Sequence, residues 1–220
     1  MKKIFWCALF ASLALMNSCL GASADMVMRA NGSGKITLEY RVSQMLESIG
    51  RLDGNERWPA LPVGRADFER SIARIPGLRL SSFSSREADN ILGGKDLVTK
   101  VTLEFKDPAA LLAFWDSTGS HASLIQGSER PSSTTHVLRL VLLDPAADTI
   151  DPDLLSLLRE ISAGYEISLS FTAAKNASLS VIPSSVAAAR LVPQGKKVSF
   201  AIDMGELVGL RDGLAIEISW

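Results

Sequence analysis

The sequence has few of the residues that most often carry enzyme chemistry. It contains two cysteines and two histidines in 220 residues, and both cysteines lie within the first 19 residues. The chain after Cys19 therefore cannot form a disulfide within itself, and it offers no thiol as a nucleophile or metal ligand. Its fold must depend on a hydrophobic core, for which a hydrophobic fraction of 47% is sufficient.

Catalytic and metal-binding motifs are equally scarce. His121 and His136 do not have the spacing of paired zinc ligands, and no serine lies in a G-x-S-x-G turn. The acidic cluster between residues 144 and 153 lacks the residue order of a calcium loop. We therefore predict no catalytic residue, no metal site and no cofactor.

Neither sign of charge is in excess. The formal net charge is −1, and it becomes −3 without residues 1–18, which hold two lysines and no acid. Because binding to nucleic acid requires a basic face, we expect no nucleic-acid partner.

The chain has one long uncharged run, at its beginning. Lys2 and Lys3 are followed by the apolar residues 4–16, which are too few for a membrane-spanning helix of about 20 residues. A basic start, a short apolar core and small residues after it are typical of a secretory signal peptide. We predict a signal peptide over residues 1–18.

Two cleavage sites compete after this leader. Residues 16–19, Met-Asn-Ser-Cys, resemble the lipobox of bacterial lipoproteins, and they depart from its usual leucine and small residue as spirochaete lipoboxes do. The prediction is that Cys19 receives a diacylglycerol and holds the protein to a membrane of the bacterial cell envelope. Cleavage after Ala24, at the Ala-Ser-Ala of residues 22–24, is the alternative, and it would release a soluble periplasmic or secreted protein.

Strict alternation of apolar and polar residues predicts strands over 35–42, 97–106, 165–172 and 214–220, and the more uniformly apolar run 137–143 is typical of a central strand. We expect the apolar side of these strands to face a common core, through Ile36, Leu38, Tyr40, Leu103, Phe105, Ile167, Leu169, Phe171, Ile216 and Ile218.

Turn and cap residues complete the fold prediction. The Asn-Gly-Ser-Gly of residues 31–34 favours an N-terminal hairpin. Asp-Pro pairs precede predicted helices over 109–117 and 153–162, and two further helices are expected over 66–75 and, in short form, 204–210. The predicted class is α+β: a mainly antiparallel sheet with about three covering helices. The signal peptide would be followed by a tether over 19–25 and a single domain over 26–220.

An arginine-rich segment is the main candidate for partner contact. Seven arginines and no lysine occur between residues 51 and 86, and Trp58 follows Arg57 in a predicted loop. Arg57, Trp58 and Arg65 would suit an anionic lipid, a glycan or an acidic protein face. The alternative is that Trp58 packs on the core and the arginines pair with neighbouring acids.

Three stretches resemble LppM-type bacterial lipoproteins. They are the hairpin MVMRANGSGKITLEY (26–40), the strand-to-helix VTLEFKDPAAL (101–111) and the closing VSFAIDMGELVGLRDGLAIEISW (198–220). The resemblance implies an envelope-anchored α+β domain without known catalytic residues. We expect a non-enzymatic binding or assembly module. The alternatives are an exported hydrolase that uses a serine or a carboxylate, and an amphiphile-binding protein with a large apolar pocket.

Overall fold

The computed structural model describes residues 19–43, 64–89, 93–116, 121–130, 133–145, 152–162, 164–184, 186 and 188–220. Strands predominate over helices, and the predicted α+β class is confirmed. The strands are β1 (Cys19–Met28), β2 (Gly34–Ser43), β3 (Leu78–Asp89), β4 (Lys95–Phe105), β5 (Ala122–Arg130), β6 (Ser133–Leu143), β7 (Glu166–Ile182), β8 (Arg190–Val192), β9 (Gln194–Asp203) and β10 (Leu214–Ser219). The described helices are α3 (Arg65–Ile72), α4 (Pro108–Trp115), α5 (Pro152–Ser162) and α6 (Met204–Leu207).

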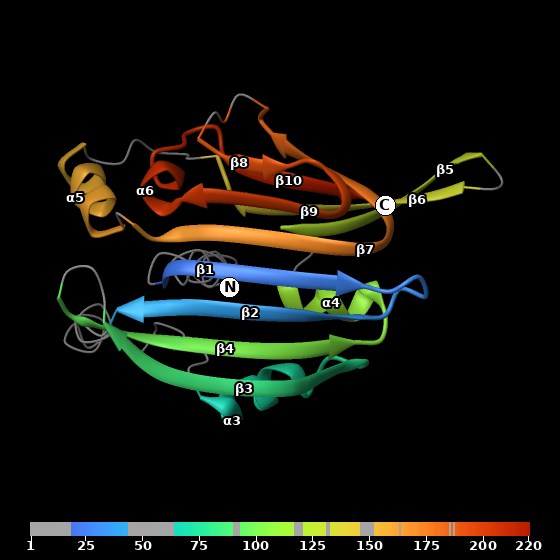
Figure 1. The fold of residues 1–220 in the computed structure, drawn as a ribbon, viewed down its shortest axis with the longest axis horizontal. Helices are drawn as coiled ribbons and strands as arrows, with labels where there is room; N and C mark the ends of the chain where they lie inside the picture. The colour runs from blue at the N-terminus through green and yellow to red at the C-terminus, as the bar shows by residue number, and fades with distance from the viewer. Residues whose placement is uncertain are drawn as a thin grey trace, which may run out of the picture.

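The strands form one curled sheet in the order β3-β4-β2-β1-β7-β10-β6-β5, with β9 on β7 and β8 on β9 (Figure 1). Among the described strands only the β1–β7 pair is parallel. The long strand β7 joins two parts of the sheet, because its first half pairs with β1 and its second half with β10, while β9 pairs with both halves. A register shift between Thr172 and Ala177 separates the two halves.

The apolar side of the alternating strands faces one core. All ten side chains expected there belong to a single cluster of apolar residues: seven are buried, and Leu38, Tyr40 and Ile167 are partly buried against them. Strand register follows from this burial, since a slip by one residue would turn each apolar set towards solvent. The opposite side of the same strands carries polar residues, including a hydroxyl contact of 3.2 Å between Thr37 and Thr102.

The first two strands form the hairpin that the Asn-Gly turn predicts. Gly32 has a φ of +82°, and the Asn31 side chain accepts hydrogen bonds from the backbone and the hydroxyl of Ser33. β1 begins at Cys19, however, and residues 19–25 pair with β2. The prediction of a tether over these residues is therefore wrong. The side chains of residues 19–25 are small, so the alternation of this strand is not visible in the sequence, although Ala24 is buried in line with Met26. β2 is long enough to supply backbone partners as far as Cys19.

The helices cover the sheet and one of its ends. In α4 the Asp107 side chain accepts a hydrogen bond of 2.9 Å from the Ala110 backbone, as the Asp-Pro pair predicts. Phe68 of α3 is buried between the rings of Tyr40 and Phe83. Figure 1 shows α5 and α6 beside the end at which β1 and β7 begin. None of the described helices is long and apolar enough to cross a membrane.

Candidate functional site

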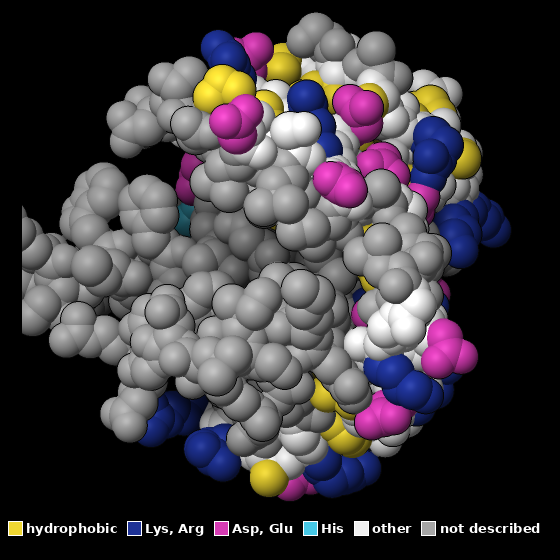
Figure 2. All heavy atoms as spheres, turned by 90° about the vertical axis from the view of Figure 1, so that its left-hand side faces the viewer, with side chains coloured by type: hydrophobic (Ala, Val, Ile, Leu, Met, Phe, Trp, Pro, Cys, Tyr) yellow, Lys and Arg dark blue, Asp and Glu magenta, His cyan; other side chains and the backbone are white. Residues whose placement is uncertain are grey.

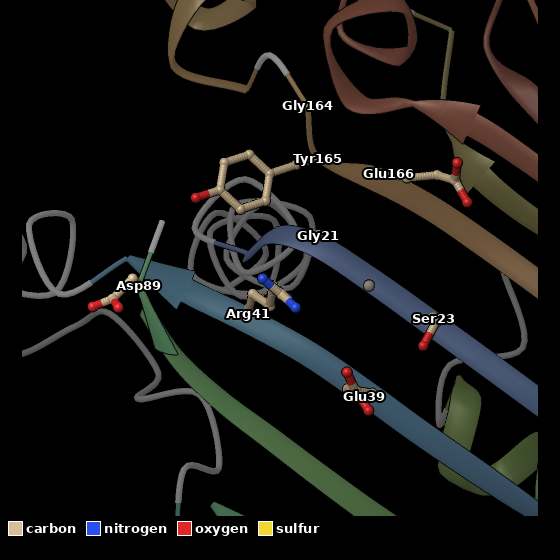
Figure 3. Close-up of a pocket in the computed structure, with 9 residues that line it drawn as sticks. Gly21, Ser23, Glu39, Arg41, Asp89, Gly164, Tyr165 and Glu166 are labelled. Carbon is tan, nitrogen blue, oxygen red and sulfur yellow. The ribbon is translucent and has the colours of Figure 1, made fainter. Parts of the chain in front are cut away.

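A polar pocket of about 370 Å³ lies at the end of the sheet where β1 and β7 begin (Figure 3). Its lining comes from the start of β1, the end of β2, the end of β3 and the segment that leads into β7. The lining residues are Gly21, Ala22, Ser23, Glu39, Arg41, Asp89, Gly164, Tyr165 and Glu166. Its volume is within the range of small-molecule sites, and its surface is divided almost evenly between polar and apolar atoms, whereas a typical amphiphile site is mostly apolar.

Strand register brings the pocket residues together. Arg41 lies opposite Gly21, and Glu39 lies opposite Ser23, in the antiparallel β1–β2 pair. Arg41 and Glu39 therefore share the polar side of β2, two residues apart. The Tyr165 ring lies beside Gly21, and a Cβ at this position would be 3.4 Å from its Cδ1, an ordinary van der Waals contact.

Tyr165 and Asp96 form a hydrogen bond across the end of the sheet at which the pocket lies. The Tyr165 hydroxyl donates a hydrogen bond of 3.0 Å to Oδ2 of Asp96, whose side chain is fully buried. Burial is the main cause that raises the pKa of Tyr165 to about 12, and the hydrogen bond and charge of Asp96 add to it. The nearby charge of Arg41 acts in the opposite direction. The phenol is therefore neutral at physiological pH, and its proton is directed towards Asp96.

The charged side chains of the pocket differ in their partners. Glu166 pairs closely with Arg190, and in Figure 3 its side chain points away from Tyr165 and Arg41. The other two carboxylates each contact one lysine, at 3.4 Å for Glu39–Lys100 and 3.5 Å for Asp89–Lys95.

Arg41 forms no ion pair with any carboxylate of the residues that the structure describes. Figure 2 looks at this end of the molecule and shows acidic and basic side chains intermingled on its described surface. The pocket therefore offers charges of both signs in place of a purely basic or acidic patch.

The structure places only part of the arginine-rich candidate site. Arg65 lies at the start of α3, where it is exposed and pairs with Glu69 at 3.1 Å. Arg57 and Trp58 lie outside the described residues, so their contact with an anionic partner stays a prediction. The backbone of Cys19 opens β1, and its lipidation stays a prediction as well.

The two histidines have different surroundings. Nε2 of His121 lies 2.9 Å from Asp144, and Nδ1 lies 3.8 Å from Asp116. Among the described residues no serine hydroxyl contacts the His121 ring, whose nitrogens contact carboxylates. His136 stacks on Trp220 with ring centroids 5.5 Å apart, an arrangement that stabilises the last strand.

A metal site does not emerge from these groups. The described part of the chain contains no cluster of three or more His, Cys, Asp or Glu side chains arranged to hold an ion. Asp116 has a structural function beside His121, since its carboxylate accepts hydrogen bonds from the backbone amides of His121 and Ala122 at the start of β5.

The sequence did not single out Arg41, Tyr165 or Asp96. Arg41 and Tyr165 were placed on alternating strands, and Asp96 precedes the predicted strand, so none of them belonged to a motif. A charged residue next to a strand is ordinary, and only the folded structure shows that Tyr165 bonds to Asp96 and lies near the charge of Arg41.

Comparison with models of known protein families gave no match, and comparison with curated proteins gave no relative. The resemblance to LppM-type lipoproteins therefore stays a prediction from the sequence.

Proposed function

We propose that this protein is a non-enzymatic lipoprotein of the bacterial cell envelope, a binding or assembly module anchored through Cys19. The observation that carries the proposal is the position of this cysteine. It follows directly after the apolar core and small residues of a leader, and no cysteine occurs after it. Lipidation gives that residue a function that neither a disulfide nor a buried thiol explains.

The position of Cys19 in the fold gives this proposal a geometric consequence. β1 begins at this residue, and Gly21, Ala22 and Ser23 belong both to the strand and to the pocket. An anchored protein would thus have almost no slack between the acyl chains and the sheet. Its pocket would lie at the level of the lipid headgroups.

Two acyl chains are needed for lasting attachment, because one chain gives only marginal and reversible binding. A diacylglyceryl cysteine supplies at least two chains, so the proposal implies stable partition into membranes without a membrane-spanning helix.

Intact-mass measurement of the protein from its native membrane tests this function. The expected mass is that of residues 19–220 plus a diacylglyceryl group, with or without an amide-linked acyl chain. Cys19→Ser should remove the lipid and leave the leader uncut or move the protein to the soluble fraction. Cys7→Ser is the matched control, because it changes a leader cysteine that the mature protein lacks. A mature chain that starts at Asp25 without lipid would refute the anchor.

A further inference from the structure

The charges of the pocket are of two kinds. Glu39 and Asp89 each form one ion pair with a lysine on the protein surface, at 3.4 Å and 3.5 Å. Such exposed ion pairs contribute little to the free energy of unfolding. Either carboxylate is therefore able to exchange its lysine for another cation at small cost. Arg41 is half-buried and has no ion-pair partner among the described residues, so its guanidinium is available to an anion.

A ligand with a single charge suits this pocket poorly. A simple anion near Arg41 would also approach the carboxylates of Glu39 and Asp89, which line the same space. A simple cation near those carboxylates would approach Arg41 in turn. A small zwitterion satisfies both groups, because its anionic end can bind Arg41 while its ammonium binds a carboxylate.

We propose that the pocket binds an aminoalkyl phosphate of the phosphoethanolamine type, with its phosphate on Arg41 and its ammonium on Glu39. The choice of phosphate depends on the proposed function, since anchoring at Cys19 places the pocket beside phospholipid headgroups. Arg41 and Glu39 lie two residues apart on one side of β2, opposite Gly21 and Ser23. Their spacing along the strand is about 7 Å, which suits a ligand whose two charges are separated by a short alkyl chain.

The first test uses soluble compounds and the purified full protein in detergent micelles. Isothermal titration should show that O-phosphoethanolamine binds at least tenfold more tightly than inorganic phosphate or ethanolamine alone. Equal affinity for the zwitterion and for either single charge would overturn the proposal. Equal binding of β-alanine, a carboxylate zwitterion, would overturn the assignment of phosphate.

Matched substitutions test the assigned residues. Arg41→Gln should weaken the binding of O-phosphoethanolamine by about tenfold to a hundredfold, because a charge-assisted hydrogen bond is lost. Lys35→Gln removes the same charge from the same side of β2 outside the pocket and should leave the affinity unchanged. Glu39→Gln should weaken O-phosphoethanolamine but not phosphate, whereas Glu69→Gln on α3 should change neither. Equal effects of Arg41→Gln and Lys35→Gln would refute the site.

A second arm identifies the source of the ligand. Micelles that contain lysophosphatidylethanolamine should compete with free O-phosphoethanolamine, and micelles with lysophosphatidylcholine should compete less, because their quaternary ammonium cannot donate hydrogen bonds. Binding of the free compound without competition by either lipid would overturn the headgroup assignment. The titrations do not require the acyl chains of Cys19. A mass without lipid would therefore refute the proposed anchor, and an absence of binding in the titration would refute the proposed ligand, each independently of the other.

Discussion

The hydroxyl of Tyr165 donates a hydrogen bond of 3.0 Å to the carboxylate of Asp96, 69 residues earlier in the chain. Tyr165 precedes β7 and Asp96 lies near the start of β4, so the bond spans the end of the sheet across β1 and β2. The ring passes over Gly21, at the distance of ordinary van der Waals contact from a Cβ built there. This contact fixes the buried side of the pocket, and it shows how the segment before β7 is held against the strands of the hairpin.

Tyr165→Phe should destabilise the fold by about 2 kcal/mol, because a fully buried carboxylate loses one of its donors. Denaturant unfolding of the parent, Tyr165→Phe, Asp96→Ala and the double variant forms a double-mutant cycle. The two single losses should not add, since both variants remove the same bond. Additive losses would mean that the hydrogen bond between the Tyr165 hydroxyl and Asp96 contributes nothing to stability.

The pKa of Tyr165 predicts a change in stability at high pH. Its folded pKa is about 12 against an ordinary value of 10.0, so its contribution is complete below pH 10 and is lost as the pH rises through 12. As the pH rises from 10 to 12, the free energy of unfolding should therefore fall less for the Tyr165→Phe variant than for the parent protein. The chain has only two tyrosines, so ultraviolet titration of a Tyr40→Phe variant follows Tyr165 alone. Ionisation near pH 10 in the folded protein would contradict the buried bond.

Gly34 should tolerate no side chain. A Cβ there would meet the carbonyl oxygen of Val27 and lie 2.5 Å from Cζ of Phe105. We expect Gly34→Ala to destabilise the protein by about 3 kcal/mol or to prevent folding, because the β1–β2 pair would have to separate. Gly21→Ala is the matched control, since its Cβ would make only ordinary contact with Tyr165. Similar midpoints of thermal unfolding for the two variants would be the contrary result.

The sequence predicted the elements whose pattern is local. Alternation identified the core side of β2, β4, β7 and β10, because one buried face imposes a period of two on each strand. The Asp-Pro pair identified α4, because capping involves residues only three apart. β3 was not predicted as a strand. A register shift between Leu80 and Ser82 moves its apolar positions out of strict alternation.

Local sequence patterns could not predict which distant segments of the chain pair with one another. The parallel pairing of β1 with β7 joins residues near 25 to residues near 170, and no periodicity in either strand specifies the partner. The candidate pocket exists only through this pairing and the β1–β2 register. The arginine-rich segment was conspicuous in composition, whereas Arg41 was one polar residue of an alternating strand.

If Cys19 is lipidated, the start of β1 at this residue gives the domain a defined orientation relative to the membrane. Lys95 and Lys106 lie at opposite ends of β4, and the register of β1, β2 and β4 places Cys19 at the Lys95 end. Eleven residue steps along the extended chain separate the two lysines by about 36 Å. If Cys19 is anchored, Lys95 should be close to the headgroups and Lys106 far from them.

Single-cysteine labels measure this difference directly. Lys95→Cys, in the first residue of β4, and Lys106→Cys, just after its last residue, remove the same charge, and each introduces the only free thiol if Cys19 is consumed by its thioether to lipid. A fluorophore at position 95 should be quenched strongly by nitroxide lipids in reconstituted vesicles, and one at position 106 should be quenched weakly. The label count is an internal control, because two thiols per chain would mean that Cys19 is unmodified. Equal quenching at both positions with one thiol per chain would show that the anchored domain moves freely, contrary to a strand that begins at the anchor.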